Sequence, residues 1–299
     1  MSKNDLVSVI VISYNAENTI LETLESIKNQ SYQNIELIVS DDCSKDKTVE
    51  ICEKWIDENK VRFVNTKLLT VEQNTGVCAN GNRGRFAATG KWLKGIAGDD
   101  ILLPNCIEDF MKYINENPSA KFVTSFRRLY NETFDEYNFL SEDTGIGDNS
   151  IYQKEANEQI RTCCKKLLAQ GPTMFYAKDV YIEVGGFNPK YIFEDYPFTL
   201  SVLEHGYQLH LLPKATVGYR LHNSLCRKQG HLFNYEYSMK TRQFFIERTF
   251  KYLSNKEIKE KKAIWEFQDF LHKHKLTNKN ALTSFIYNKT IALIHYLYR

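Results

Sequence analysis

Two nucleotide-binding signatures are missing from this chain. The first apolar segment runs into Ser-Tyr-Asn at 13–15 and not into a G-x-G-x-x-G turn, which argues against a dinucleotide-binding domain. Gly90-Lys91 is followed by Trp92 and not by Ser or Thr, so the phosphate loop of P-loop proteins is also absent. An α/β chain that lacks both signatures must bind any nucleotide in another way.

Disulfide and membrane-span signatures are missing as well. The seven cysteines are odd in number and form no C-x-x-C pair, and the amino terminus, MSKNDLVSV, does not resemble a signal peptide. No apolar run approaches the roughly 18–20 residues of a membrane span. Residues 281–298 come nearest, but Asn288, Lys289 and His295 interrupt them. We therefore expect a cytoplasmic protein with reduced thiols, peripheral on the inner membrane face if it meets a membrane.

Charge is divided unevenly along the chain. The net charge is only +2, but residues 227–299 hold 15 Lys and Arg against six Asp and Glu, a net +9. This excess fits an anionic membrane or a homodimer contact, and it is equally typical of solvated helix faces. We expect no nucleic-acid partner. The cations and aromatics considered for a membrane contact are Lys251, Lys256, Lys259, Lys261, Lys262, Trp265, Phe267 and Phe270.

The hydrophobic pattern of the first hundred residues predicts strands alternating with helices. Residues 6–13 form a β-branched run of the kind that is buried on both faces of a parallel sheet. Further strands are predicted at 35–39, 61–64 and 91–97, with helices after residues 19 and 46 and over 76–89. This alternation indicates a doubly wound, mostly parallel α/β sheet.

The second half of the chain continues the sheet and then becomes helical. Strands are predicted at 121–130, 173–176, 209–212 and 216–221, and a polar loop at 131–150. Helices are predicted at 155–169, 178–184, 194–204, 231–250, 256–274 and 279–298. We therefore expect one α/β domain over residues 1–228 and a basic helical extension over 229–299.

The segment from Gly95 to Pro104 carries two adjacent carboxylates. Asp99 and Asp100 follow a predicted strand and precede a helix that Pro104 can open. Open α/β sheets place ligands at the carboxyl ends of their strands. Two neighbouring carboxylates repel each other unless a cation neutralises them, and Mg²⁺ suits such oxygen ligands. The same pattern also fits an acidic turn in which Asp100 caps the helix.

A second acidic pair, Asp41-Asp42, ends the next predicted strand. A carboxylate there could accept the N3–H of uracil or thymine, or a ribose hydroxyl, but turn and cap roles fit equally well. The ring of Tyr14 suits either stacking on a base or packing in the core.

Taken together, these segments resemble the inverting family-2 glycosyltransferases of the GT-A fold, of the bacterial surface-polysaccharide type. The resemblance covers about residues 6–225 and implies a nucleotide-sugar donor and a divalent metal, Mn²⁺ or Mg²⁺. The segments that carry it are 7–15, 31–46, 74–76, 98–104, 184–187 and 193–196.

The resemblance also implies roles for individual residues. The metal would be held by Asp99, Asp100 and His222, with Asp100 in direct contact and Asp99 also near the ribose. Asp195 would be the catalytic base beside Glu194, and Arg220 would neutralise the diphosphate. The remaining donor contacts implied are Ser13, Tyr14, Asn15, Asp41, Asp42 and Asn74.

Two departures from the family pattern affect this assignment. The first acid of the family's acid-small-acid-acid run is replaced by Ala97, so the metal would depend on Asp99 and Asp100. The family's Ala-Arg-Asn segment is Asn-Gly-Asn at 80–82, where Arg83 or Arg85 is the candidate substitute.

The expected function is metal-dependent, inverting transfer from a UDP- or dTDP-sugar to an acceptor hydroxyl. A lipid-linked oligosaccharide of surface polysaccharide synthesis is the expected acceptor, and residues 223–230 could form a lid. Two alternatives stay open. A nucleotidyltransferase would normally carry a Gly- and Lys/Arg-rich loop after the first strand, where this chain has Ser-Tyr-Asn-Ala-Glu at 13–17. A non-catalytic nucleotide-sugar binding protein would release no nucleoside diphosphate.

Overall fold

A computed structural model describes residues 4–143, 149–221 and 228–298 of the chain. The chain divides into two compact units, Met1–Leu221 and His222–Arg299, which we describe separately. The boundary that we expected after residue 228 falls seven residues beyond this division. The expected metal ligand His222 and most of the expected lid lie outside the described residues.

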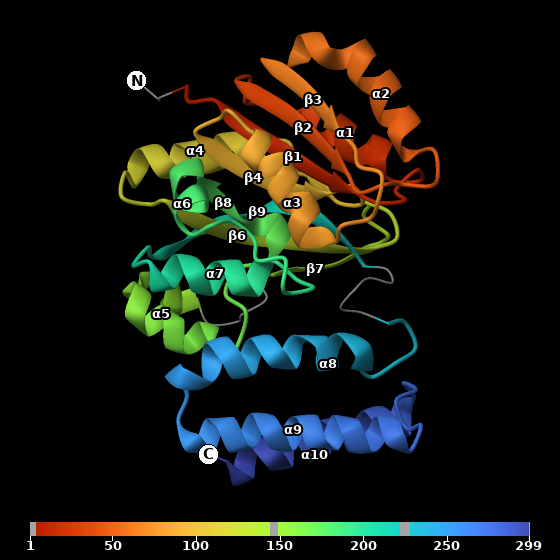
Figure 1. Cartoon of the computed structure of the whole chain (residues 1–299), viewed down its shortest axis with the longest axis vertical. Helices are drawn as coiled ribbons and strands as arrows, with labels where there is room; N and C mark the ends of the chain where they lie inside the picture. The colour runs from red at the N-terminus through yellow and green to blue at the C-terminus, as the bar shows by residue number, and fades with distance from the viewer. Residues whose placement is uncertain (1–3, 144–148, 222–227, 299) are drawn as a thin grey trace. The chain divides into compact units, whose positions relative to one another are not determined.

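Four parallel strands form one half of the sheet in the Met1–Leu221 unit. They are β1 (Val7–Ser13), β2 (Ile35–Asp41), β3 (Asn65–Leu69) and β4 (Trp92–Ala97), in the order β3-β2-β1-β4 (Figure 1). The run of β-branched residues in β1 is buried on both faces, as its sequence predicts. The prediction of a strand at 61–64 is wrong. Val61 and Val64 are 94% and 60% exposed, and the strand begins at Asn65.

The other half of the sheet mixes strand directions. Within the described residues the full path is β3-β2-β1-β4-β8-β6-β9-β5, and β7 pairs with β6. Both pairs formed by β8 are antiparallel, whereas the longest pair, β6 with β9, is parallel. The bounds are β5 (Ile101–Leu102), β6 (Phe122–Asn131), β7 (Phe139–Asp143), β8 (Phe175–Ala177) and β9 (Leu209–Leu221).

Two of the strand predictions for this half need correction. The polar loop expected over 131–150 contains β7, an edge strand that pairs with β6 alone among the described strands. The two strands expected at 209–212 and 216–221 are a single strand, β9. Pro213 lies at an irregular part of the β6–β9 pairing, where the register shifts next to Phe126, so the strand continues past it.

Helices cover this sheet and connect its strands. In Figure 1, α1 and α2 follow β1 and β2 in the red-to-orange part of the chain. The helix expected over 155–169 ends earlier, at Cys163. The described helices are α1 (Ile20–Lys28), α2 (Thr48–Asn59), α3 (Val77–Ala87), α4 (Cys106–Glu116), α5 (Ala156–Cys163), α6 (Lys178–Glu183) and α7 (Asp195–Glu204). Short 3₁₀ turns occur at Lys60–Arg62, Asn149–Gln153 and Gly171–Thr173.

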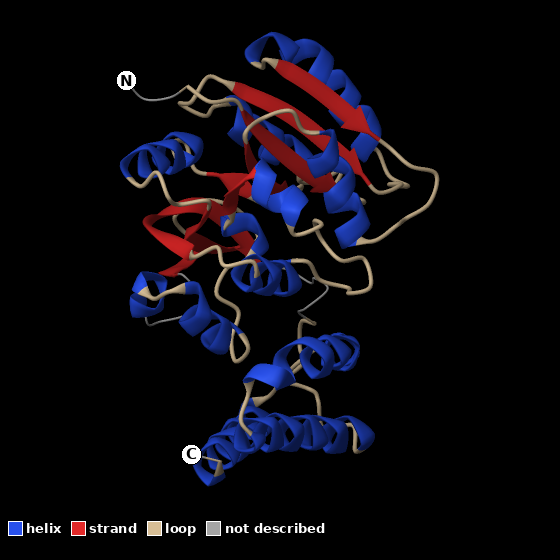
Figure 2. Cartoon of the chain, turned by 60° about the vertical axis from the view of Figure 1, so that its left-hand side comes forward, coloured by secondary structure: helices blue, strands red, loops and turns tan. Residues whose placement is uncertain are grey.

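The second unit consists of helices, as expected, and Figure 2 shows them in blue. Helix α8 (Tyr235–Phe244) continues through a π-helical turn, Phe245–Thr249, and is followed by α9 (Asn255–Lys273) and α10 (Ala281–Leu297). Capping boxes begin α9, with Ser254 and Glu257, and α10, with Asn280 and Thr283. No helix within the described ranges has both the length and the apolar character needed to cross a membrane.

A close approach between α3 and the sheet explains one glycine of the first unit. A Cβ at Gly84 would overlap Cγ2 of the fully buried Ile10 on β1. We expect Gly84→Ala to destabilise the protein by about 1–3 kcal/mol through overpacking, partly offset by the better helix propensity of Ala. Urea unfolding measures this change. Lys54→Ala, on the exposed face of α2, is the control, and equal stability of the two variants would contradict the packing of α3 on β1.

Candidate active site

The carboxyl ends of β1 and β2 hold Asp41 between hydrogen-bond donors. Ser13 pairs with Asp41 in the strand register, and its Oγ donates to Asp41 Oδ2 at 2.9 Å. The backbone N–H of Ser44 donates to Asp41 Oδ1 at 2.8 Å, and the Ser44 hydroxyl donates to Oδ2 at 2.5 Å. Asp41 is fully buried. Its carboxylate is fixed by these donors and serves to shape the turn that follows β2.

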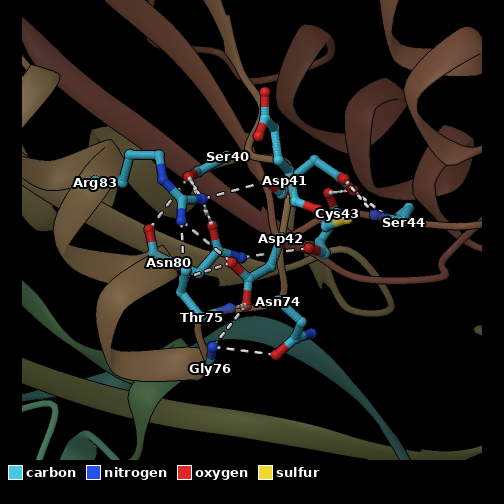
Figure 3. A network of polar contacts seen from close by, with 12 residues as sticks. Ser40, Asp41, Asp42, Cys43, Ser44, Asn74, Thr75, Gly76, Asn80 and Arg83 are labelled. Carbon is cyan, nitrogen blue, oxygen red and sulfur yellow. Dashed lines mark hydrogen bonds and ion pairs between the residues drawn. The ribbon is translucent and has the colours of Figure 1, made fainter.

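Asp42 connects this turn to the segment before α3 (Figure 3). The backbone N–H groups of Thr75 and Gly76 donate to its Oδ2 at 2.9 and 2.7 Å, and the Thr75 hydroxyl donates to Oδ1 at 2.6 Å. Arg83 forms an ion pair with Oδ1 at 3.2 Å. Asn74 closes the segment, because its Oδ1 accepts the Gly76 N–H at 3.2 Å. The structure therefore brings Asp41, Asp42 and Asn74 together in one polar network.

Tyr14 and Asn15 lie beside this network. Asn15 has a left-handed backbone with φ of 52°, and its side-chain oxygen accepts the Lys45 N–H at 2.8 Å. Its own N–H donates to Ser44 Oγ at 2.8 Å. The side chain of Tyr14 is 50% exposed. A half-exposed ring next to an ordered polar turn suits stacking on a planar ligand better than packing in the core.

The second acidic pair is organised by β9. The backbone N–H of Arg220 donates to Asp100 Oδ1 at 2.9 Å, and Arg220 Nε donates to the carbonyl of Asp99 at 2.9 Å. Asp100 is 2% exposed. Burial and the neighbouring Asp99 raise the pKa of Asp100 well above its ordinary value, and Arg220 opposes this rise. A cation placed against Asp100 would favour its charged form.

The guanidinium of Arg220 is already engaged within the protein. It pairs with Glu22 at 2.5 Å, donates to the carbonyl of Glu132 and lies 4.3 Å from the ring centroid of Phe134. This residue therefore ties β9 to α1 and to the start of the segment that leads into β7. Contact with a diphosphate would require the guanidinium to share or exchange these partners.

The donor set of the Asp99-Asp100 pair fits a hard divalent ion in part. Among the residues that the structure describes, no three His, Cys, Asp or Glu side chains gather into a group that could hold a metal. Mg²⁺ is usually bound through one or two carboxylates, with water and substrate phosphates completing its shell. Two adjacent carboxylates, one of them buried, match that pattern. They would depend on the substrate for the other ligands.

The third acidic pair lies at the start of α7. Asp195 Oδ1 accepts the Tyr196 N–H at 2.7 Å, and the backbone N–H of Gly171 also donates to the Asp195 carboxylate. Burial, followed by the charge of Glu194, raises the pKa of Asp195 to about 7. Burial raises the pKa of Glu194 too, and the buried Arg85 opposes that shift. Both residues are half-buried.

These raised pKa values also affect the stability of the fold. Between the ordinary value of 3.8 and about 7, folded Asp195 retains a proton that the unfolded chain has lost. The free energy of unfolding therefore falls as the pH rises through this range. The fold accepts an acidic pair that destabilises it at neutral pH, which is typical of a functional site.

Sequence reasoning missed the turn that supports Asp195. Gly171 begins the Gly171–Thr173 turn, and a Cβ there would lie 2.9 Å from Glu194 Oε1. Lys94 on β4 is fully buried and donates through Nζ to the carbonyls of Pro172 and Met174. Burial lowers the pKa of Lys94 to about 8. The only sequence signal was a lysine inside an otherwise apolar strand.

The two candidate substitutes for the family's arginine have different surroundings. Arg83 pairs with Asp42, as described above. Arg85 lies in the core, where Nε donates to the Tyr176 hydroxyl at 2.6 Å and the guanidinium lies 4.5 Å from the ring centroid of Phe187. A Cβ at Gly95 would overlap this guanidinium. Arg85 therefore acts from within the core, facing Glu194 electrostatically, while Arg83 belongs to the network around Asp42.

Comparisons with known proteins assign the family. The family model for glycosyl transferase family 2 matches residues 8–184. A Haemophilus influenzae protein, described as an uncharacterized glycosyltransferase, is 30% identical over 263 residues, 85% of this chain and 76% of that protein. Glycosyltransferase GlyG of Streptococcus pneumoniae is 32% identical over 143 residues, 48% of this chain and 45% of GlyG.

Solved structures support the same fold. S. aureus TarS 1–349 in complex with UDP-GlcNAc has a TM-score of 0.58 and 21% identity, covering 89% of this chain and 72% of that chain. The complex of the same TarS fragment with UDP has a TM-score of 0.57 and 23% identity, covering 72% of this chain and 60% of the other. The chain therefore belongs to glycosyl transferase family 2, and the GT-A fold with a helical carboxyl-terminal segment is confirmed.

The close approach at Gly171 gives a test of the Glu194-Asp195 pair. We expect Gly171→Ala to displace the Glu194 carboxylate, because the added Cβ would lie 2.9 Å from Oε1. Turnover of a nucleotide sugar should fall about tenfold or more, since displacement of a reacting group by about 1 Å can cost about a hundredfold. Steady-state kinetics measure this loss. Lys154→Ala, at an exposed position, is the control, and unchanged turnover in Gly171→Ala would contradict a functional role for the pair.

Proposed function

We propose that this family-2 protein is an inverting, metal-dependent glycosyltransferase that uses a UDP- or dTDP-sugar. The observation that carries the proposal is the half-buried Asp195 at the start of α7, where burial and the charge of Glu194 raise the pKa of its carboxyl group to about 7. The carboxylates of Asp41 and Asp42, in contrast, accept three and four hydrogen bonds from the protein. Carboxylates placed in such different environments are typical of a divided acid–base and binding task.

Asp195 is the proposed general base. It would take the proton from the acceptor hydroxyl while that oxygen forms its bond to the anomeric carbon and the bond to the nucleoside diphosphate breaks. A base with a pKa near the working pH is both ionised and basic enough for this transfer. Glu194 raises that pKa and so tunes the base. A single displacement inverts the anomeric configuration and needs no covalent intermediate.

Asp100 and Asp99 are the proposed ligands of Mn²⁺ or Mg²⁺. The bound ion would supply Lewis-acid stabilisation of the charge that develops on the diphosphate leaving group. Arg220 holds Asp100 through its backbone N–H, and we propose that its guanidinium neutralises the diphosphate when donor is bound. His222, outside the described residues, remains the predicted third ligand.

The nucleoside of the donor is proposed to lie along the ends of β1 and β2. Tyr14 would stack on the base, and Ser13, Asn15 and Asn74 would line the pocket around Asp42, with Asp41 behind them. TarS has the same fold as this chain, and its structures in complex with UDP and with UDP-GlcNAc support a nucleotide-sugar donor. The donor selectivity of UDP over dTDP would then depend on contacts to the ribose and the base.

The acceptor is proposed to be a lipid-linked oligosaccharide of surface polysaccharide synthesis, reached on the inner face of the membrane. The positive charge of residues 227–299 supports this location. A protein that only binds nucleotide sugars is the remaining alternative. It is favoured by Ala97 and by the absence, among the described residues, of a group of three His, Cys, Asp or Glu side chains that could hold a metal.

The pKa of Asp195 predicts how turnover depends on pH. Protonated Asp195 cannot accept a proton, so activity is lost as the pH falls below about 7. We expect kcat for nucleoside diphosphate release to rise about tenfold per pH unit below that value and then to level off. Asp195→Asn should lower kcat by about 10²–10⁴-fold and remove this pH dependence. Full activity of the Asp195→Asn variant would contradict the assignment of Asp195 as the base.

Donor binding has its own test, by thermal shift. UDP at about a hundred times its Kd should stabilise the protein by about 2.7 kcal/mol in the presence of Mn²⁺. Asp100→Asn should lose the part of the shift that depends on Mn²⁺, because it removes the charge of the metal ligand. Asp57→Asn, on an exposed helix face, is the matched control. An Mn²⁺-dependent shift of equal size in Asp100→Asn would place the metal elsewhere.

A further inference from the structure

Helix α10 exposes large apolar side chains on one face, near both of its ends. At about 100° per residue its large exposed side chains fall within about 120° of the helix circumference and extend over about 22 Å. These side chains form what we call the α10 stripe: Leu282, Phe285, Ile286, Leu293, Tyr296 and Leu297, each between 46% and 72% exposed. An apolar surface of this length on the outside of a protein is typical of an interaction site.

The opposite face of α10 is occupied by its own unit. Tyr287 stacks against Phe267 of α9 and against Phe233, with ring centroids 6.0 and 5.7 Å apart. His295 contacts Glu260 of α9 at 2.5 Å. These contacts fix the helix by one side, so the α10 stripe faces away from α9. The helix is apolar on both sides but covered on only one of them.

The charged side chains on and just before α10 are basic. Helix α10 contains no Asp or Glu. Lys289 lies within the stripe, and its Nζ is 5.7 Å from the ring centroid of Phe285. Lys275 and Lys279 are exposed just before the helix begins. An apolar face with cations along it complements a surface that combines apolar and anionic groups.

Lys289 also distinguishes a bilayer from a second copy of the chain. It lies near the middle of the stripe, so a two-fold pairing over the whole stripe would bring Lys289 against its own copy. Like charges facing each other in an apolar interface are unfavourable. At a bilayer, by contrast, the apolar stem of Lys289 can lie along the acyl boundary while the ammonium reaches the phosphates.

We propose that the α10 stripe docks this protein on an anionic phospholipid bilayer, with α10 lying in the plane of the interface. This proposal deepens the membrane location proposed above and rests on it. The proposal also places the membrane contact on α10 instead of on residues 251–270, which were considered from the sequence. Of the aromatics considered from the sequence, Trp265 and Phe267 are half-buried and stack with Phe250 and Tyr287. Phe270 of α9 is 53% exposed, but α10 supplies six large exposed apolar side chains.

Vesicle flotation of the full chain tests the proposal. We expect the protein to float with phosphatidylcholine vesicles that contain phosphatidylglycerol, more weakly with pure phosphatidylcholine, and less at high salt. The double variant Phe285→Ser, Leu293→Ser and the charge variant Lys289→Glu should each lower the bound fraction at least about fivefold. Asn288→Ser, exposed on α10 but off the stripe, is the matched control and should float like the unaltered chain.

Two further measurements separate the outcomes. Circular dichroism checks that each variant is folded, and the UDP thermal shift in each variant should equal that of the unaltered chain. If UDP raises the melting temperature of neither the unaltered chain nor any variant, the proposed function is contradicted. The flotation result still tests membrane docking in that case. Absence of flotation, or flotation unaffected by the stripe variants, would overturn docking. A concentration-dependent dimer that the stripe variants abolish, without flotation, would assign the stripe to a second copy.

Discussion

The burial of carboxylates is the physical constraint on which the rest of this structure depends. A buried carboxylate must be hydrogen-bonded, paired with a cation or protonated. The protein uses a different solution at each acidic pair. Backbone and hydroxyl donors hold Asp41 and Asp42, and the Arg220 backbone holds Asp100. The Glu194-Asp195 pair keeps a proton up to about pH 7.

The sheet and its core position the groups that stabilise these carboxylates. Parallel pairing of β1, β2 and β4 brings their carboxyl ends to one edge, and the long β9 delivers Arg220 to Asp100. Two buried cations lie within electrostatic reach of these acids, Arg85 of Glu194 and Lys94 of Asp100. Lys94 also holds the carbonyls of the turn that donates to Asp195. The base is thereby connected to the centre of the sheet.

The sequence predicts the parts of this arrangement that are local. The runs at β1 and β4 are largely apolar, and acidic pairs at strand and helix ends are visible without any structure. The sequence does not predict the edge strand β7, because Phe-Leu-Ser-Glu-Asp at 139–143 has no alternating apolar pattern and only β6 pairs with it among the described strands. The two strands expected at 209–212 and 216–221 are one strand because the irregular pairing accommodates Pro213.

The supporting residues of the site could not be predicted in the same way. A buried Arg85 needs the space left by Gly95, and the role of Gly171 appears only when α7 places Glu194 against it. Those relations join residues that are distant in the chain. The family resemblance marked the acids themselves, whereas their pKa values depend on burial, which only the folded chain defines.

A titration of Asp195 tests the central claim most directly. Carbon-13 NMR of the side-chain carboxyl groups, with the Asp195 signal assigned by its absence in Asp195→Asn, would follow protonation in the full chain. The account predicts a midpoint of about 7 for Asp195, because burial and Glu194 disfavour its charged form. A midpoint near the ordinary value of 3.8 would contradict both the buried pair and its use as a base.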